Sequence, residues 1–156
     1  MNTTPDDKSI QVLKELIDVC EDGEQGFMRC AERVQRPELK QLFEARAREC
    51  RVAADQLASL AGEEHHAPGE GGSVAGAMHR GWVAVKDAVT PADDELAVLQ
   101  ECERGEDYAL HRYQEAMQAP LPPAVKDVVA HQYEGVRRNH DQVKALRQQA
   151  DMQKGA

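Results

Sequence analysis

The most constraining feature of this sequence is residues 96–117, LAVLQECERGEDYALHRYQEAM, which place two glutamates on the apolar face of a helix. Apolar residues recur here at alternating steps of three and four, the spacing of the buried face of a helix in a bundle. Glu103 and Glu106 occupy the middle of that face. Because glutamate is almost never fully buried unless it is paired or binds a metal ion, the rest of the fold must supply partners for these carboxylates.

Three other segments repeat this arrangement, an apolar helical face that polar residues interrupt. Alanine, leucine, glutamate, glutamine and arginine dominate the composition, which favours helix throughout. The expected helices with their interruptions are 7–34 with Glu24, 37–61 with Arg46 and Glu49, 91–118 with Glu103 and Glu106, and 123–150 with Gln132 and His140.

The connection between the second and third of these helices is long. It opens with GEEHHAPGEGGS, whose glycines, proline and charges predict a loop, and continues into a short extra helix at 73–89. A connection of this length lets the helix at 91–118 run parallel to the helix at 37–61. The sequence therefore predicts one all-α domain over 1–156, a four-helix bundle with a short helix in its long crossover.

The interruptions are expected to lie at one level of this bundle. Glu49 stands as far beyond Pro37 as Glu103 stands beyond Pro91, so two parallel helices would bring the two carboxylates level. At about 1.5 Å per residue, the other interruptions fall within roughly two turns of the same level. We expect a polar layer to which all four long helices contribute.

Five sequence runs carry a family resemblance: DGEQGF, PELKQLF, GSVAGAMHRGW, ECERGED and RRNHDQVKALR. With them, the chain from about Ile10 to Leu146 resembles an uncharacterised proteobacterial family of ferritin-like four-helix-bundle proteins, a domain of unknown function. The resemblance implies a ferritin-like bundle and leaves the activity open. The sequence does not indicate a substrate or an enzymatic reaction.

Two interpretations of the polar layer remain open. In the first, it binds iron, manganese or zinc, since carboxylates with an imidazole suit these ions, and the protein handles iron or acts in oxidative stress. The layer lacks the paired Glu-x-x-His motifs of ferritin-type centres, because Val52 follows Glu49 by three residues. In the second, it is a metal-free Arg/Glu/His network in a structural or stress-response bundle. The ligands of the first interpretation would be Glu24, Glu49, Glu103, Glu106 and His140, with Arg46 and Gln132 around them.

Small residues near the layer also permit two interpretations. Gly23 and Gly26 flank Glu24, either because another group approaches the backbone there or because the turn is weak and faces solvent. Cys50 and Cys102 lie at similar depth and are expected to be buried as small apolar side chains, with a facing redox pair as the alternative.

Charge and composition exclude several functions. The net charge of −9 argues against binding to a nucleic-acid backbone, and no run of 18 apolar residues predicts a membrane span. The polar N-terminal residues do not resemble a signal peptide. We expect a cytoplasmic bacterial protein that forms a homo-oligomer, with a dimer favoured.

Overall fold

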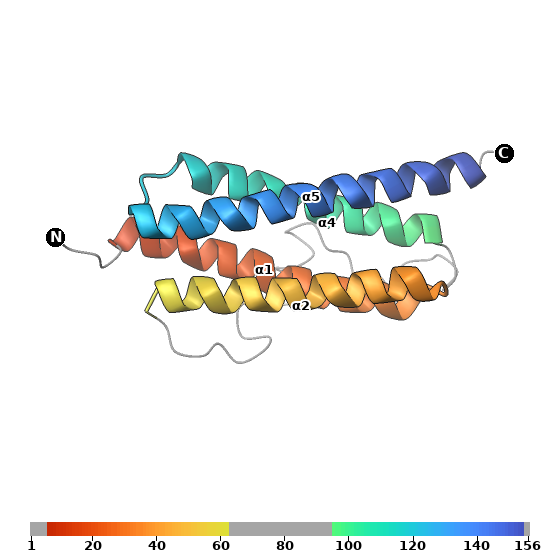
Figure 1. The fold of residues 1–156 in the computed structure, drawn as a ribbon, viewed down its shortest axis with the longest axis horizontal. Helices are drawn as coiled ribbons and strands as arrows, with labels where there is room; N and C mark the ends of the chain where they lie inside the picture. The colour runs from red at the N-terminus through yellow and green to blue at the C-terminus, as the bar shows by residue number, and fades with distance from the viewer. Residues whose placement is uncertain (1–5, 63–94, 155–156) are drawn as a thin grey trace.

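The computed structural model describes residues 6–62 and 95–154, which form four helices and no strand. Helices α1 (Asp7–Arg33) and α2 (Pro37–Leu60) make one antiparallel hairpin, and α4 (Glu95–Gln118) and α5 (Pro123–Lys154) make the other (Figure 1). No helix in these ranges is both long and apolar enough to cross a membrane. The extra helix predicted at 73–89 lies outside the described residues.

The two hairpins are related as the long connection predicts. In Figure 1 both α2 and α4 run from the right-hand end of the bundle to the left-hand end. Arg36, just before α2, donates hydrogen bonds to both carboxylate oxygens of Glu95, the first residue of α4, over 2.8 and 3.2 Å. The predicted parallel arrangement of these two helices is confirmed.

Local sequence signals account for most of the helix ends. The carboxylate of Asp6 accepts a hydrogen bond from the Ser9 amide at 2.8 Å and caps α1. Pro37 and Pro123 open α2 and α5, where a proline loses no helical hydrogen bond. The largest error is at the end of α5, which continues to Lys154 rather than ending at 150. No glycine or proline interrupts residues 150–154.

The hydrophobic core is divided into two clusters along the bundle axis. Each cluster is built from all four helices, and each contains buried aromatic and aliphatic side chains. Near the middle of the bundle, the last buried residues of one cluster are Phe27, Ala47, Cys102 and Val143, and those of the other are Cys20, Ala54, Tyr113 and Val129.

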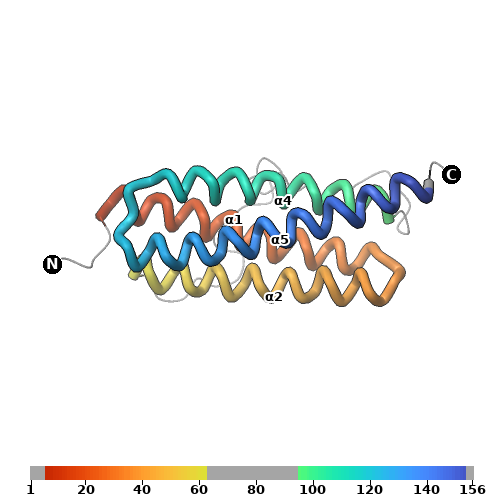
Figure 2. Tube along the Cα trace, turned by 45° about the horizontal axis from the view of Figure 1, so that its top comes forward, coloured from red at the N-terminus to blue at the C-terminus, as the bar shows by residue number. Residues whose placement is uncertain are grey.

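The four helices do not pack equally closely. α1 packs along α2 and against α4, and α4 packs along α5. α2 and α5 lie next to each other in Figures 1 and 2 but approach less closely, and a groove of about 760 Å³ separates part of their length. The bundle therefore has a closed side at α1 and α4 and an open side between α2 and α5.

Candidate functional site

A polar layer separates the two hydrophobic clusters. On each helix, we define the layer as the residues between the innermost buried residue of one cluster and that of the other. These stretches are residues 21–26 of α1, 48–53 of α2, 103–112 of α4 and 130–142 of α5. All the predicted interruptions fall in these stretches except Arg46, which lies two positions outside. Apart from Arg46, the predicted interruptions therefore lie between the two clusters along the bundle axis. Its residues include Glu24, Glu49, Glu103, Glu106, Gln132 and His140.

Glu106 is deeply buried in this layer, with only 4% of its surface exposed. Burial raises the pKa of its carboxyl group to about 8, because the low-dielectric interior disfavours the charged form. The positive charges of Arg46 and His140 oppose this rise in pKa, whereas Glu49 and Asp107 add to it. Arg46, Glu49, Asp107 and His140 therefore lie within electrostatic range of Glu106.

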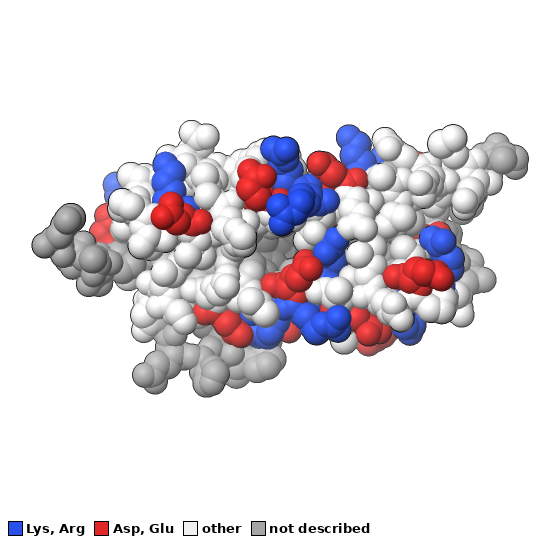
Figure 3. Space-filling model, viewed as in Figure 1, with Lys and Arg blue, Asp and Glu red and all other residues white. Residues whose placement is uncertain are grey.

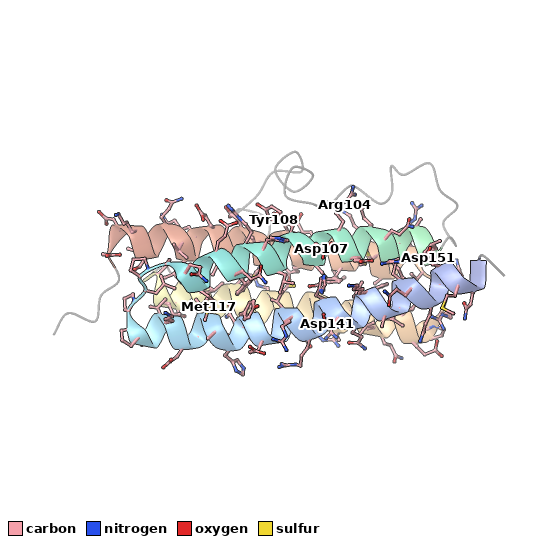
Figure 4. All side chains as sticks on the ribbon, turned by 90° about the horizontal axis from the view of Figure 1, so that it is seen from above. Arg104, Asp107, Tyr108, Met117, Asp141 and Asp151 are labelled. Carbon is pink, nitrogen blue, oxygen red and sulfur yellow. The ribbon has the colours of Figure 1, made fainter. Side chains whose placement is uncertain are left out.

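His140 is held by two aspartates. Its Nε2 contacts the Asp107 carboxylate of α4, and its Nδ1 lies 3.2 Å from the Asp141 carboxylate. Figure 4 shows Asp107 and Asp141 on these two neighbouring helices, near the middle of the bundle. Burial lowers the pKa of the imidazole, but the hydrogen bonds to the two aspartates outweigh it, so the pKa of His140 is raised. Both ring nitrogens are occupied by aspartates that were not predicted to belong to the site.

Arg46 and Glu49 face α5 across the groove. The Nη1 of Arg46 donates to both oxygens of Glu49 at 3.1 Å, and its Nη2 contacts the Gln142 amide oxygen of α5. Asn139 donates to Glu49 at 3.2 Å. Arg46 Nε is buried and has no hydrogen-bond acceptor in the described part of the chain.

Glu49 differs from the expectation of an inward-facing carboxylate, because its side chain is 56% exposed. The core face of α2 runs through Phe43, Ala47 and Leu57, and the position of Ala47 on it turns Glu49 towards solvent. Glu49 therefore lines the groove instead of the closed interior. Polar and apolar residues are closely interspersed along α2. The sequence pattern therefore predicts which side of this helix is buried only to within one residue position.

Glu103 and Glu24 are each paired with an arginine of another helix. Arg147 of α5 grips both oxygens of Glu103, with Nε at 2.6 Å and Nη2 at 3.2 Å, and these bonds raise the pKa of the guanidinium. Arg51 of α2 donates to Glu24 at 3.4 Å. Neither Arg147 nor Arg51 was among the residues predicted for the site.

Gln132 belongs to a different hydrogen-bond chain from the one expected. Its amide oxygen accepts from the buried Tyr113 hydroxyl at 2.8 Å, and its amide nitrogen donates to Gln56 at 3.0 Å. The Tyr113 oxygen also lies 3.2 Å from the Cys20 sulfur. These contacts join all four helices at the edge of the layer, and none of them involves the predicted ligands.

The cysteines and glycines near the layer serve close helix packing. Cys102 faces Cys30, with the two sulfurs 2.9 Å apart. The Cys50 sulfur lies 2.9 Å from the point that a Cβ on Gly23 would occupy. Of the two interpretations of Gly23, close approach of another group is therefore correct, and the group is a thiol of α2.

The residues do not fit a ferritin-type two-metal centre. Within residues 6–62 and 95–154, no three histidine, cysteine, aspartate or glutamate side chains are arranged to hold one metal ion. Arginines already neutralise Glu24, Glu49 and Glu103. Sequence reasoning also missed Glu21 and Asp22, which are buried because residues 19–23 of α1 are covered around the whole helix.

Comparison with known proteins adds a family. Residues 8–119, from the first turn of α1 to the residue after α4, match a domain of unknown function, DUF2383. The match spans well over half of the chain, so the chain belongs to this family. No curated protein matches it.

Proposed function

We propose that this member of the DUF2383 family is a ferritin-like bundle without ferritin chemistry, a non-catalytic structural or stress-response protein. The bundle consists of two antiparallel hairpins, and α2 and α4, the helices that the long connection joins, run in the same direction. This arrangement supports the ferritin-like assignment, because ferritin-like folds have one long crossover between antiparallel pairs. The polar layer then sets the register of the helices through matched charges.

The observation that carries this proposal is the bidentate pair of Glu103 and Arg147. It joins Glu103, at the edge of the layer on α4, to Arg147 of α5 beyond the layer, and its side chains are only 17% and 24% exposed. A guanidinium fork matches a carboxylate in both distance and plane, so this geometry favours one helix register over its neighbours. In this position the arginine balances the charge that a metal ion would balance in a ferritin.

Metal binding is the competing function, and elemental analysis separates the two. The full-length protein is produced with iron, manganese and zinc supplied, and its metal content is measured after gel filtration. We expect far less than one metal ion per chain. Near-stoichiometric metal that disappears in Glu103→Ala would refute the charge network and support the metal centre.

A second measurement tests the network itself. Replacing both partners, as in Glu103→Leu with Arg147→Leu, leaves no unpaired charge and is expected to keep or raise the melting temperature. Glu103→Leu alone is expected to lower it slightly, since Arg147 keeps its bond to Asp151 at 2.7 Å. If the double variant melts at a much lower temperature than the wild type, or does not fold, the role of this pair is not limited to helix register.

A further inference from the structure

The contact between Cys30 of α1 and Cys102 of α4 places two thiols within reach of a covalent bond. Both side chains are completely buried, and the Cys102 thiol donates to the Cys30 sulfur over 2.9 Å. This is closer than two unbonded sulfur atoms ordinarily pack. A small movement of the two side chains is enough to bring them to the covalent S–S length of about 2.05 Å.

The other two cysteines have different neighbours. The Cys20 sulfur lies 3.2 Å from the Tyr113 hydroxyl, and the Cys50 sulfur packs against the backbone of α1 at Gly23. Thiol-to-thiol contact is therefore shown for Cys30 and Cys102, which the sequence pattern did not pair.

The two thiols lie where the two hairpins meet. Cys30 belongs to the hairpin of α1 and α2, and Cys102 belongs to the hairpin of α4 and α5. α1 and α4 pack more closely than α2 and α5 do. Figure 3 looks onto the open side of the bundle and shows acidic and basic side chains along the junction between α5 and α2. A bond between Cys30 and Cys102 would therefore join the hairpins covalently on the closed side.

We propose that Cys30 and Cys102 are the site of a reversible oxidation, in which hydrogen peroxide converts the two thiols into a disulfide. One sulfur attacks a peroxide oxygen, the O–O bond breaks, and a sulfenic acid and one water form. The second sulfur then attacks the sulfenic sulfur, the S–S bond forms, the S–O bond breaks, and a second water leaves. The two thiols lose two electrons and two protons, and the peroxide takes up both. A dithiol reductant restores both thiols by exchange.

Burial controls the rate of this reaction. The thiolate is the nucleophile, and burial together with the neighbouring Cys30 raises the pKa of the Cys102 thiol well above its ordinary value. Oxidation is therefore expected to be slow in the closed bundle and faster when the α1–α4 interface opens locally. After the first sulfur is oxidised, the second already lies beside it, which favours the disulfide over reaction with an external thiol.

The disulfide is expected to stabilise the bundle. Cys30 and Cys102 are 72 positions apart in the chain, so the bond closes a long loop in the unfolded state and lowers its conformational entropy. For a chain of this length, we expect the melting temperature of the oxidised protein to exceed that of the reduced protein by roughly 10 °C.

Peptide mapping of the full-length protein tests the proposal. The folded protein is treated with hydrogen peroxide, without urea and at urea concentrations below the unfolding transition, and free thiols are then alkylated. Trypsin places each cysteine in a peptide of its own: 15–29, 30–33, 49–51 and 87–104. We expect a linked pair of peptides 30–33 and 87–104 that forms faster in low urea and that dithiothreitol separates.

Variants connect this bond to stability. Cys20→Ala with Cys50→Ala is the matched control, because it keeps only the proposed pair; it is expected to form the same link and to show the same rise in melting temperature on oxidation. Cys30→Ala is expected to lose both. If Cys30→Ala does not fold, the wild type and the control variant still decide the question.

Three results would overturn the proposal. The first is the absence of the linked pair in the folded wild type after peroxide treatment, including a pair that appears only above the unfolding transition. The second is a link between peptides 15–29 and 49–51 in its place, which would assign the oxidation to Cys20 and Cys50. The third is an oxidised protein that melts at or below the temperature of the reduced protein, which would mean that the native packing does not accommodate the bond.

Discussion

Replacing Glu106 by glutamine tests the electrostatics of the polar layer most directly. The pKa of this buried carboxyl group is about 8 in the folded protein, against an ordinary value of 4.5. Between these two values the folded chain holds a proton that the unfolded chain has released, so a rise in pH favours unfolding. The stability associated with the protonated acid is complete below pH 4.5 and is lost as the pH rises towards 8.

The size of the effect follows from the difference in pKa. Each unit between the folded and unfolded pKa corresponds to about 1.4 kcal/mol. At pH 7 the pH lies 2.5 units above the unfolded value of 4.5 and still below the folded value of about 8, so Glu106 costs about 3 kcal/mol of unfolding free energy. Glutamine has nearly the same shape and no charge. Glu106→Gln is therefore expected to be more stable than the wild type by about this amount at pH 7.

The assay is urea unfolding of both proteins, followed by helix content at several pH values from 5 to 9. The difference in unfolding free energy is expected to be small at pH 5, to grow by about 1.4 kcal/mol per pH unit, and to level off above pH 8. Glu115→Gln, on the exposed side of the same helix, is the matched control and is expected to show a flat difference.

A difference that does not change with pH would refute this reasoning. It would mean that Arg46 and His140 stabilise the ionised carboxylate enough to offset its burial. His140 itself has a raised pKa, so its contribution to stability is present at low pH and is lost as the pH rises through that value. The comparison of Glu106→Gln with the wild type separates the carboxyl from the imidazole, which both proteins retain.

Two further predictions concern packing on either side of the layer. Gly23→Ala is expected to lower the free energy of unfolding by about 1–3 kcal/mol, because its Cβ would lie 2.9 Å from the Cys50 sulfur. In urea unfolding, the double variant with Cys50→Ala is expected to recover this loss. An equal loss in both variants would exclude this contact as the cause. Phe43→Ala is expected to cost about 3–5 kcal/mol in the same assay, since the ring is fully buried and stacks on Phe27 with centroids 6.2 Å apart. A cost below about 1 kcal/mol would show that this end of the core repacks freely.

The sequence predicted the helices and the level of the layer because both depend on regular repeats. A rise of about 1.5 Å per residue converts residue number into depth, so Glu49, Glu103 and His140 were placed near one height before any contact was known. The parallel course of α2 and α4 followed from the length of the connection. These features require only that the chain be helical, that the turn within each hairpin be short and that the connection between the hairpins be long.

The partners within the layer could not be predicted in the same way. Whether Glu103 meets Arg147, and Glu24 meets Arg51, depends on how far each helix is rotated about its own axis. Rotating a helix by one residue position, about 100°, moves a side chain from the core to the groove. Glu49 shows this difference, because it was expected in the core and its side chain is 56% exposed. Long arginine side chains enlarge this uncertainty, because they reach partners more than a turn away from their own backbone position.

The unequal packing of the four helices explains how one layer can hold several charges in a folded protein. On the closed side, α1 and α4 approach through thiols, with Cys30 against Cys102, and Glu106 on this part of α4 is desolvated. On the open side, the groove lets water reach Glu49, whose ion pair with Arg46 then costs little desolvation. A metal ion would compensate charge at one point only, whereas arginines from α2 and α5 compensate it at several. Glu106 is buried and has a raised pKa, so a change in its protonation alters the stability of the whole bundle.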